Sequence, residues 1–211
     1  MNKYLEIVKH YENCLDKYGD SHLGVDWPNA SDAQTRYRIM EECIFFNTNE
    51  KFDKRLSILD FGCGASHFYE YLLNSKRIKD FEYIGVDLSP KFIDLCNRKY
   101  PDNQYYCYDI LNYDPGETYD YIIANGVFTE KVTLTFDEMF DYFKKAILKL
   151  YNLSNKGLAF NVMSEQVDWK REDLFHLPFD SLAAFLCSNV TRKFIFRNDY
   201  GLYEYTVYIY K

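Results

Sequence analysis

The sequence predicts an α/β fold, in which helices cover both faces of a mainly parallel sheet. From residue 55 onward, short apolar runs alternate with helical segments, and this alternation is typical of strands joined by right-handed helical crossovers. Three of the predicted strands end in an acid, at Asp60, Asp87 and Asp109. Because parallel sheets bind ligands beyond the carboxyl ends of their strands, these carboxylates predict a binding site at one edge of the sheet.

Length and charge exclude several other classes of protein. The chain has 211 residues, of which 47% are apolar, so one domain with a substantial core is expected. Its formal net charge of −7 disfavours binding to nucleic acid or to an anionic membrane surface. No run of about 18 apolar residues occurs, and the opening segment is too charged for a secretion signal. We therefore expect a cytoplasmic protein, monomeric or homodimeric, with neither a nucleic-acid nor a membrane partner.

The six cysteines predict neither a zinc site nor a disulfide framework. No two of them are within four residues of each other, so the paired spacing typical of zinc ligands is missing. A chain of this size with a full core does not need disulfides. We expect reduced, mostly buried thiols and no metal. The cysteines lie at positions 14, 43, 63, 96, 107 and 187.

Two helices and a loop are predicted before the alternating region. Residues 4–17 predict a helix with one apolar face, which carries Leu5, Val8, Tyr11, Cys14 and Leu15. Glycines and a proline within residues 19–28 predict a loop. Ser31 and Asp32 can cap a second helix that runs to about residue 46.

The alternating region predicts five strands, four helices and a final antiparallel hairpin. Ser89 and Pro90 predict a helix start, because serine caps a helix well and proline fits its first turn. The predicted strands cover residues 56–60, 83–87, 105–109, 119–124 and 158–163; further helices lie around residues 68–72 and over 136–150 and 178–187; the hairpin pairs 192–196 with 202–210.

The turn after the first strand favours a ligand without a diphosphate. Gly62 and Gly64 permit a sharp turn and let a ligand approach the backbone closely. In a dinucleotide fingerprint a third glycine would follow, but that position is His67. The glycine-lysine motif of nucleotide-phosphate loops is also absent from the chain.

Residues at the next two strand ends predict a nucleoside site. The Asp87 carboxylate, 23 residues after Gly64, can accept hydrogen bonds from both ribose hydroxyls. Asp109 can accept the amino group of adenine, and Leu88 and Ile110 flank an apolar slot for the base. Together these residues predict a site for adenosine without a phosphate chain.

Four motifs, in this order along the chain, resemble those of the class I S-adenosylmethionine-dependent methyltransferases, in particular stand-alone bacterial enzymes that act on small molecules. The resemblance covers roughly residues 55–163. It implies a Rossmann-like three-layer sandwich whose seven-stranded sheet ends in an antiparallel hairpin, with S-adenosylmethionine as cofactor and S-adenosylhomocysteine as product. The motifs are Leu-Asp60-Phe-Gly-Cys-Gly64, Gly-Val-Asp87-Leu-Ser, Tyr-Asp109-Ile and Tyr-Asp120-Tyr-Ile-Ile-Ala-Asn-Gly126.

The resemblance also implies a role for each motif residue. Asp60 would orient the glycine turn or reach the amino group of the cofactor through water. The remaining roles follow the order of the motifs: Gly62, Cys63 and Gly64 would cradle the methionine part, Asp87 would hold the ribose beside Leu88, Asp109 and Ile110 would contact the adenine, and Asn125 and Gly126 would form the wall nearest the sulfonium.

The N-terminal 50 residues are interpreted as a helical lid over a methyltransferase domain of residues 51–211, because small-molecule methyltransferases often carry such a lid. Trp27 is a candidate to close over the cofactor, and packing is its alternative role. Arg36 is a candidate to pair with the methionine carboxylate, and a surface position is its alternative.

The predicted reaction is methyl transfer to a small acceptor, with oxygen as the accepting atom. Positioning supplies much of the rate in such a displacement at an activated sulfonium, but an alcohol acceptor still needs a base. His176 is the first candidate by pKa, Glu165 and Asp168 are the alternates, and a packing role for His176 remains open. A sugar, capsule or phosphoryl-modified precursor is the expected acceptor.

Three other functions remain as alternatives. A nucleic-acid methyltransferase is disfavoured by the net charge and by the sequence Asn125-Gly-Val-Phe, which stands where base amino-methylating enzymes carry Asn-Pro-Pro-Tyr. A catalytically inactive cofactor-binding partner subunit is a further alternative, and the intact glycines and acids argue against a loss of cofactor binding. A dinucleotide oxidoreductase is disfavoured by His67.

Overall fold

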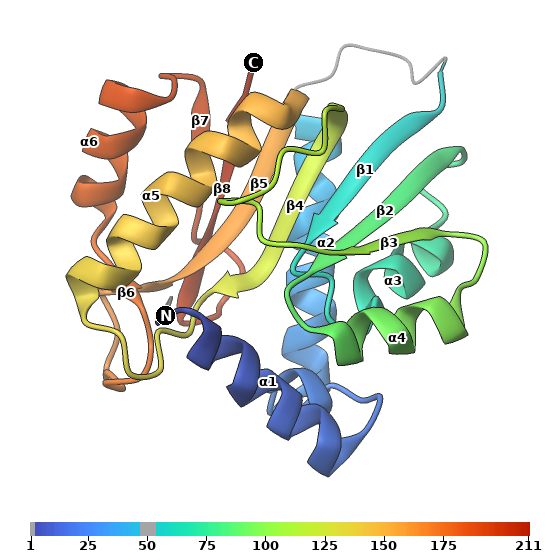
Figure 1. Cartoon of the computed structure of the whole chain (residues 1–211). Coiled ribbons are helices and arrows are strands. Elements are labelled where there is room, and N and C mark those ends of the chain that lie inside the picture. Colours follow the sequence, from blue (N-terminus) through green and yellow to red (C-terminus); the bar gives the residue numbers. More distant parts are fainter. Residues whose placement is uncertain (1–2, 47–53) are drawn as a thin grey trace.

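The computed structural model describes residues 3–46 and 54–211 of the chain (Figure 1). The boundary expected between residues 50 and 51 lies outside the described residues. In chain order the elements are α1 (Leu5–Tyr18), η1 (Leu23–Val25), α2 (Ala30–Phe46), β1 (Leu56–Phe61), α3 (His67–Ser75), β2 (Phe81–Asp87), α4 (Pro90–Lys99), β3 (Gln104–Cys107), β4 (Tyr119–Phe128), α5 (Phe136–Leu153), β5 (Ser154–Ser164), β6 (His176–Leu177), α6 (Phe179–Asn189), β7 (Phe194–Arg197) and β8 (Glu204–Tyr210).

The strands form one mixed sheet in the order β3-β2-β1-β4-β5-β8-β7. The first five strands pair in parallel, and β8 is antiparallel to both β5 and β7. This arrangement confirms the predicted α/β sandwich with its C-terminal hairpin. It adds one strand that the sequence did not predict, because β6 consists of two residues that pair with the end of β5.

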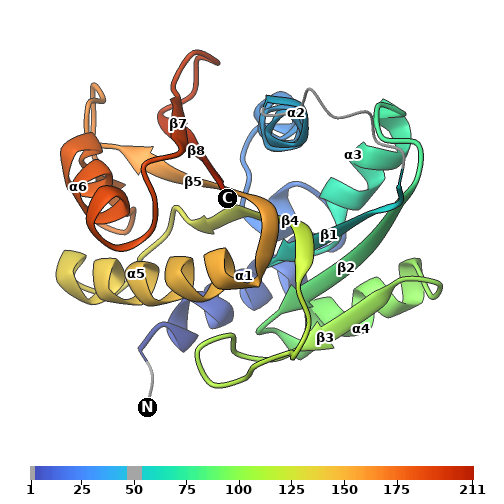
Figure 2. The ribbon, with the colours of Figure 1, turned by 90° about the horizontal axis from the view of Figure 1, so that it is seen from above.

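Helices cover both faces of the sheet, each over its own apolar core. The core on one face contains the buried residues of α2 and α3 and part of α4, and the other contains those of α5 and α6. Figure 2 shows α2 and α3 on one side of the sheet and α5 on the other. Phe143 of α5 is fully buried and contacts the rings of Phe128, Phe160 and Phe175. Burial of these large rings stabilises this layer.

Local capping explains where three helices begin. The Ser89 hydroxyl accepts a hydrogen bond from Phe92 N and Pro90 fills the first turn of α4, as the sequence predicted. Thr135 forms a reciprocal capping box with Glu138 at the start of α5. For α2 the predicted caps were wrong: Ser31 and Asp32 lie inside the helix, and Asn29 accepts a hydrogen bond from Ser31 N (2.9 Å).

The N-terminal segment divides into a part that crosses the strand ends and a part that packs on the sheet. The helix α1 lies across the carboxyl ends of the strands (Figure 1). It turns Ile7 inward, whereas Leu5, which was predicted on its apolar face, is 42% exposed. In contrast, Met40 and Ile44 of α2 are fully buried against the sheet. Of the described N-terminal elements, α1 and η1 thus lie apart from the layer that α2 forms on the sheet, and a lid role for the N-terminal segment remains a prediction.

The strand order places the crevice of the sheet at β1 and β4. The strand β1 pairs with β2 on one side and with β4 on the other. From β1 the chain first adds β2 and β3 on one side and then adds β4 and β5 on the other, so the strand order reverses between β1 and β4. Ligands of open α/β sheets bind at such a reversal, beyond the carboxyl ends. Among the described residues, no helix combines the length and the apolar character needed to cross a membrane.

Candidate functional site

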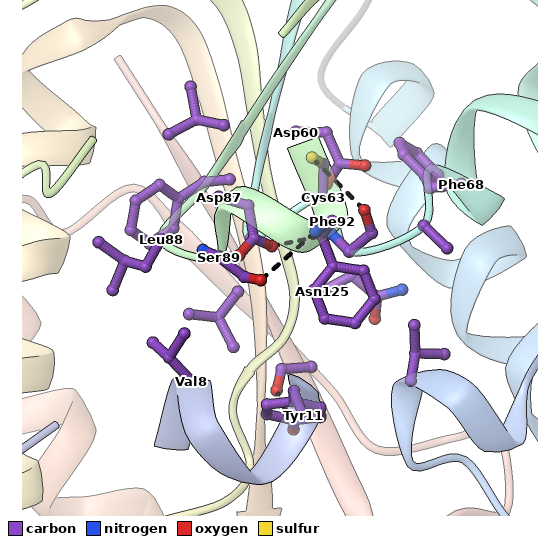
Figure 3. A pocket seen from close by; sticks show the side chains of 18 of the residues that line it. Val8, Tyr11, Asp60, Cys63, Phe68, Asp87, Leu88, Ser89, Phe92 and Asn125 are labelled. Carbon is purple, nitrogen blue, oxygen red and sulfur yellow. Dashed lines mark hydrogen bonds between the residues drawn. The ribbon is translucent and has the colours of Figure 1, made fainter. Parts of the chain in front are cut away.

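A largely apolar cavity lies between α1 and the carboxyl ends of β1, β2 and β4 (Figure 3). The three predicted motifs at these strand ends therefore meet in one place. The lining comprises residues 60–65, 86–89 and 125–127 from the strand ends; Tyr4, Ile7, Val8, Tyr11, Val25, Trp27 and Tyr37 from the N-terminal segment; His67, Phe68, Phe92 and Tyr142 from the helices; and Tyr108 from the loop after β3.

The turn after β1 brings backbone close to the cavity. Gly62 and Gly64 have φ angles of +73° and +50°, a region that side chains rarely adopt. A Cβ atom at Gly62 would lie 2.4 Å from Val127 Cγ2, so only glycine fits. Gly62 N and Cys63 N both donate hydrogen bonds to Val86 O (2.7 and 3.0 Å), and these bonds fix the turn against β2.

Asp87, the last residue of β2, holds this turn to the start of α4. Its Oδ2 accepts a hydrogen bond from Gly64 N (3.0 Å) and its Oδ1 accepts one from Ser89 N (2.8 Å). Burial raises the pKa of Asp87, and the hydrogen bonds from these two backbone groups oppose the rise. The carboxylate is thus held in a fixed orientation at the cavity wall.

Asp60 of β1 is almost completely buried beside the same turn. Its side chain is 2% exposed and accepts a hydrogen bond from Tyr83 Oη (2.6 Å). Burial raises the pKa of Asp60 to about 7, the Tyr83 hydrogen bond lowers it, and the charge of Asp87 raises it further. The carboxyl group can therefore change its charge near neutral pH.

A series of contacts runs from Gly126 through neighbouring side chains and back to Trp27, and it holds the Trp27 ring over Gly126. A Cβ atom at Gly126 would lie 3.1 Å from Trp27 Cζ2. Gly126 N donates a hydrogen bond to Asn161 Oδ1 (2.7 Å), and Asn161 Nδ2 donates one to Glu204 Oε1 (2.8 Å). Arg36 Nε donates to Glu204 Oε2 (2.7 Å) and its guanidinium lies over the Trp27 ring at 4.8 Å. These contacts join one wall of the cavity to α2 and β8.

Asn125 contributes a buried acceptor to the cavity wall (Figure 3). Its Oδ1 atom is shielded from solvent and receives no hydrogen bond from the described residues. Leaving such an acceptor unpaired costs about 1–3 kcal/mol. The position suits a ligand that brings a donor or a positive charge.

Polar contacts fix α1 over the opening. The Tyr4 hydroxyl donates a hydrogen bond to Asp109 Oδ2, and the Tyr4 ring stacks on Tyr142 with ring centroids 4.6 Å apart. Ser89 Oγ donates to Glu12 Oε1 (2.6 Å). The helix is therefore attached to the elements on both sides of the cavity.

Most of the predicted cofactor residues come together at this cavity, and three do not line it. Ile110 is 1% exposed and belongs to the core, because the chain turns inward after β3. Asp109 lies outside the lining and accepts hydrogen bonds from Tyr4 and from Asn112 Nδ2 (2.6 Å). The residues that do line it are Trp27, Asp60, Gly62, Cys63, Gly64, Asp87, Leu88, Asn125 and Gly126.

Arg36 requires a correction of its predicted partner. The guanidinium is only 17% exposed and forms an ion pair with Glu204, whose side chain is 2% exposed. Because its charge is already neutralised within the protein and the residue is not part of the cavity lining, Arg36 supports Trp27 from behind. It is not placed to bind a carboxylate in the cavity.

The three predicted bases lie outside the cavity lining. His176 in β6 has Nδ1 2.7 Å from Ser164 O, and its Nε2 is buried without a partner among the described residues. Glu165 is paired with Lys170 (3.0 Å), and Asp168 is exposed. His176 is half-buried, and of the three it is the one with a solvent-shielded side-chain atom that lacks a partner among the described residues.

Sequence reasoning did not identify the aromatic wall of the cavity or one buried carboxylate. Tyr11 was predicted on an apolar helical face, but such a face is equally typical of core packing. Nothing in the sequence around Tyr108 and Tyr142 distinguishes a cavity residue from a core residue. Glu130 follows β4 and is 7% exposed. Burial raises the pKa of Glu130 to about 7, and the charge of Asp26 adds to the rise.

Comparisons with known proteins agree with this geometry. Residues 59–157 match a family model described as a methyltransferase domain. Rv1506c of Mycobacterium tuberculosis, provisionally named a methyltransferase, is 27% identical over 162 residues, which are 74% of this chain and 93% of that protein. A malonyl-[acyl-carrier protein] O-methyltransferase of Ilyobacter polytropus is 31% identical over 99 residues, which are 46% of this chain and 35% of that enzyme.

Solved structures share the fold over the whole chain. Magnesium protoporphyrin IX methyltransferase from Synechocystis PCC 6803, solved with bound S-adenosylmethionine, has a TM-score of 0.66 at 14% identity and covers 100% of this chain and 97% of its own. A TehB-like methyltransferase from Corynebacterium glutamicum has a TM-score of 0.60 at 15% identity and covers 97% and 100%.

The fold and the cavity define an α/β protein with a binding cavity at its strand reversal. The match of residues 59–157 to a methyltransferase-domain model, and the fold shared with solved methyltransferases, agree with the predicted family, enzyme class and cofactor. The predicted fold is thereby confirmed, whereas the roles of individual residues remain predictions.

The Arg36–Glu204 pair should stabilise the fold much more than its neighbour on the same helix does. Arg36→Ala leaves the buried Glu204 carboxylate without its cation, so we expect the free energy of unfolding to fall by about 3 kcal/mol. Arg38→Ala removes an exposed pair with Glu42 and should cost about 0.5 kcal/mol or less. Urea denaturation measures both, and equal losses would contradict the role given to the buried pair.

Asp60 should make stability depend on pH in a defined direction. Its pKa is about 7 in the folded chain and about 4 when unfolded. Between these values the folded chain holds a proton that the unfolded chain has released, so stability decreases as pH rises. Compared with Asp60→Asn, the wild type should lose up to about 1.4 kcal/mol per pH unit between about pH 4 and 7. Parallel curves of unfolding free energy against pH would refute this.

Proposed function

We propose that the cavity holds S-adenosylmethionine and that the chain transfers its methyl group to a small-molecule acceptor, with oxygen as the accepting atom. The observation that carries the proposal is the convergence of Asp60, the glycine turn, Asp87 and Asn125 on one cavity at the strand reversal. The malonyl-[acyl-carrier protein] enzyme among the relatives is an O-methyltransferase, which supports oxygen. A sugar, capsule or phosphoryl-modified precursor is the proposed acceptor class.

The adenosine half is proposed to lie along the end of β2. Asp87 would exchange part of its bonding to the Gly64 and Ser89 backbone for the two ribose hydroxyls, since a carboxylate has enough lone pairs for several donors. Leu88 and the Tyr142 ring would bound the base. Asp109 would accept the adenine amino group once its hydrogen bond from Tyr4 is exchanged.

The methionine half is proposed to lie against the glycine turn. Gly62, Cys63 and Gly64 let the ligand approach the backbone closely. Asp60 would hold the cofactor's amino group, directly or through water, and the positive charge would favour the ionised carboxylate. Asn125 Oδ1, a buried acceptor with no partner among the described residues, would face the sulfonium end.

His176 is proposed as the base for an alcohol acceptor. If Nδ1 carries the hydrogen and donates it to Ser164 O, the neutral ring presents Nε2 as an acceptor. This nitrogen is buried without a partner among the described residues, so it can take the hydroxyl proton of an acceptor that reaches it. Glu165 and Asp168 are the weaker candidates because one is ion-paired and the other is exposed.

The other functions have less support. A net charge of −7 disfavours a nucleic-acid acceptor. A partner subunit that had lost cofactor binding would have no need of the turn and carboxylates at this cavity. An oxidoreductase would need room for a diphosphate at the turn, where the His67 side chain lines the cavity.

Binding of S-adenosylmethionine should depend on Asp87. Asp87→Ala removes the ribose acceptor, so we expect the cofactor affinity to fall by about 2–4 kcal/mol in isothermal titration. Asp102→Ala, an exposed aspartate after α4, is the matched control and should bind normally. Circular dichroism checks that both variants fold. Tight binding of NAD together with no binding of S-adenosylmethionine would overturn the proposed function.

His176 should affect turnover more than cofactor binding. His176→Asn keeps a donor for Ser164 O but removes the base, so we expect kcat to fall by about 100-fold or more while the affinity for S-adenosylmethionine is unchanged. Glu172→Gln, which changes an exposed carboxylate of the same loop, serves as the control. Turnover is followed as S-adenosylhomocysteine release, and mass spectrometry identifies the acceptor by a gain of one methyl group. A full-rate His176→Asn enzyme would assign the residue to packing.

A further inference from the structure

A group of metal-type donors lies beside the cavity and has no role in the proposed reaction. His10 and Cys14 are four residues apart and so project from the same face of α1. Asp26, just after η1, faces them, with His10 Nε2 2.8 Å from Asp26 Oδ2. One donor atom from each of these three residues lies within 4.8 Å of the other two.

The backbone holds Asp26 in place. The residue has a φ angle of +58°, in the left-handed region, and its N–H donates a hydrogen bond to Leu23 O (3.1 Å). The following residue, Trp27, donates its N–H to His22 O (2.8 Å). The carboxylate is therefore presented to α1 by a tight turn, so little ordering is needed before it can bind a ligand.

Glu130 lies close enough to this group for their charges to interact. The residue is only 7% exposed. The charges of Asp26 and His10 both act on the Glu130 carboxylate, and its own charge acts on Cys14. Two carboxylates that repel each other beside an imidazole and a thiol are stabilised together by a bound cation.

We propose that the clustered side chains of His10, Cys14 and Asp26 bind one divalent transition-metal ion, with Glu130 as the proposed fourth ligand and Zn²⁺ as the expected occupant. Imidazole nitrogen, thiolate sulfur and carboxylate oxygen form the mixed donor set that Zn²⁺ takes, whereas Mg²⁺ and Ca²⁺ prefer oxygen alone. Zinc bonds of about 2.0–2.3 Å place tetrahedral ligands roughly 3.3–3.8 Å apart, so small side-chain rotations suffice for the three clustered residues. Binding releases the thiol proton of Cys14, and any proton on His10, to solvent.

The charges around the group agree with a bound dication. A thiolate and two carboxylates bring three negative charges, of which Zn²⁺ balances two. The positive charge of Arg171 acts on Glu130, but Arg171 is paired with Asp173, so the loaded site would carry one net negative charge.

Such an ion would join three walls of the cavity. Tyr11, next to His10 in the sequence, and Trp27, next to Asp26, both line the cavity, and Glu130 follows the Asn125–Gly126 wall by four residues. Coordination would hold α1 and the turn after η1 to the segment that follows β4. The site is separate from the proposed methyl transfer and does not depend on it.

Cobalt and zinc titrations of the full-length, tag-free, reduced protein test the site directly. Co²⁺ should bind with one ion per chain and give the thiolate charge-transfer absorption of a Co–S bond, and Zn²⁺ should displace it with a Kd of about 1 µM or tighter. Cys14→Ser should abolish the charge-transfer band. His10→Ala, Asp26→Asn and Glu130→Gln should each weaken Zn²⁺ binding at least about 10-fold.

Matched controls separate this site from other thiols and from the proposed function. Cys107→Ser and Cys187→Ser remove the exposed cysteines and should leave the band, the stoichiometry and the affinity unchanged. Asp87→Ala, which tests the cofactor site, should also leave Zn²⁺ binding unchanged. Absence of Co²⁺ binding, or a band that survives Cys14→Ser and is lost with Cys107 or Cys187, would overturn the proposal whatever the result for methyl transfer.

Discussion

The carboxylate of Asp87 is the interaction on which the site depends. With one oxygen on Gly64 N and the other on Ser89 N, it joins the turn after β1 to the start of α4. Without it, two backbone N–H groups would be left unpaired beside the cavity, and the glycine turn would lose its attachment to the neighbouring strand end. The same carboxylate is the proposed ribose acceptor. One carboxylate thus fixes the glycine turn and is also the proposed hydrogen-bond acceptor for the ribose. Both roles need an acceptor at the strand reversal between β1 and β4.

Local patterns predicted the parts of the site that come from single strand ends. Gly62 and Gly64 were recognisable because the turn needs positive φ angles and close backbone approach, and Asp87 because it follows an apolar run. The Arg36–Glu204 pair joins residues 168 positions apart, and the Tyr4–Asp109 bond joins residues 105 apart. A local sequence pattern cannot reveal partners so far apart. Arg36 was therefore predicted to bind the methionine carboxylate of the cofactor, and Asp109 was predicted to lie in the cavity.

The elements of the fold that could be predicted are likewise those with a local sequence pattern. Apolar runs predicted the parallel strands and the hairpin, because burial on both faces leaves a clear pattern. The two-residue strand β6 has no such pattern, since it depends on pairing with Met163 and Ser164 of β5. His10 and Cys14 are a visible pair at helical spacing, but Asp26 and Glu130 join them only through a turn and the end of β4. For this reason the cysteine spacing alone predicted no metal.

Buried polar groups fall into two kinds: those whose hydrogen-bond partners come from the chain itself and those that have none among the described residues. Glu41 is fully buried and accepts hydrogen bonds from Ser75 Oγ (2.6 Å) and Arg77 Nη1 (2.9 Å). Away from the cavity, the chain therefore supplies the hydrogen-bond donors that this buried carboxylate needs. Asn125 Oδ1 in the cavity wall and His176 Nε2 outside it have no partner within the described chain. Since leaving each unpaired costs about 1–3 kcal/mol, their presence is best explained by partners that the chain does not supply: the cofactor and the acceptor proposed above.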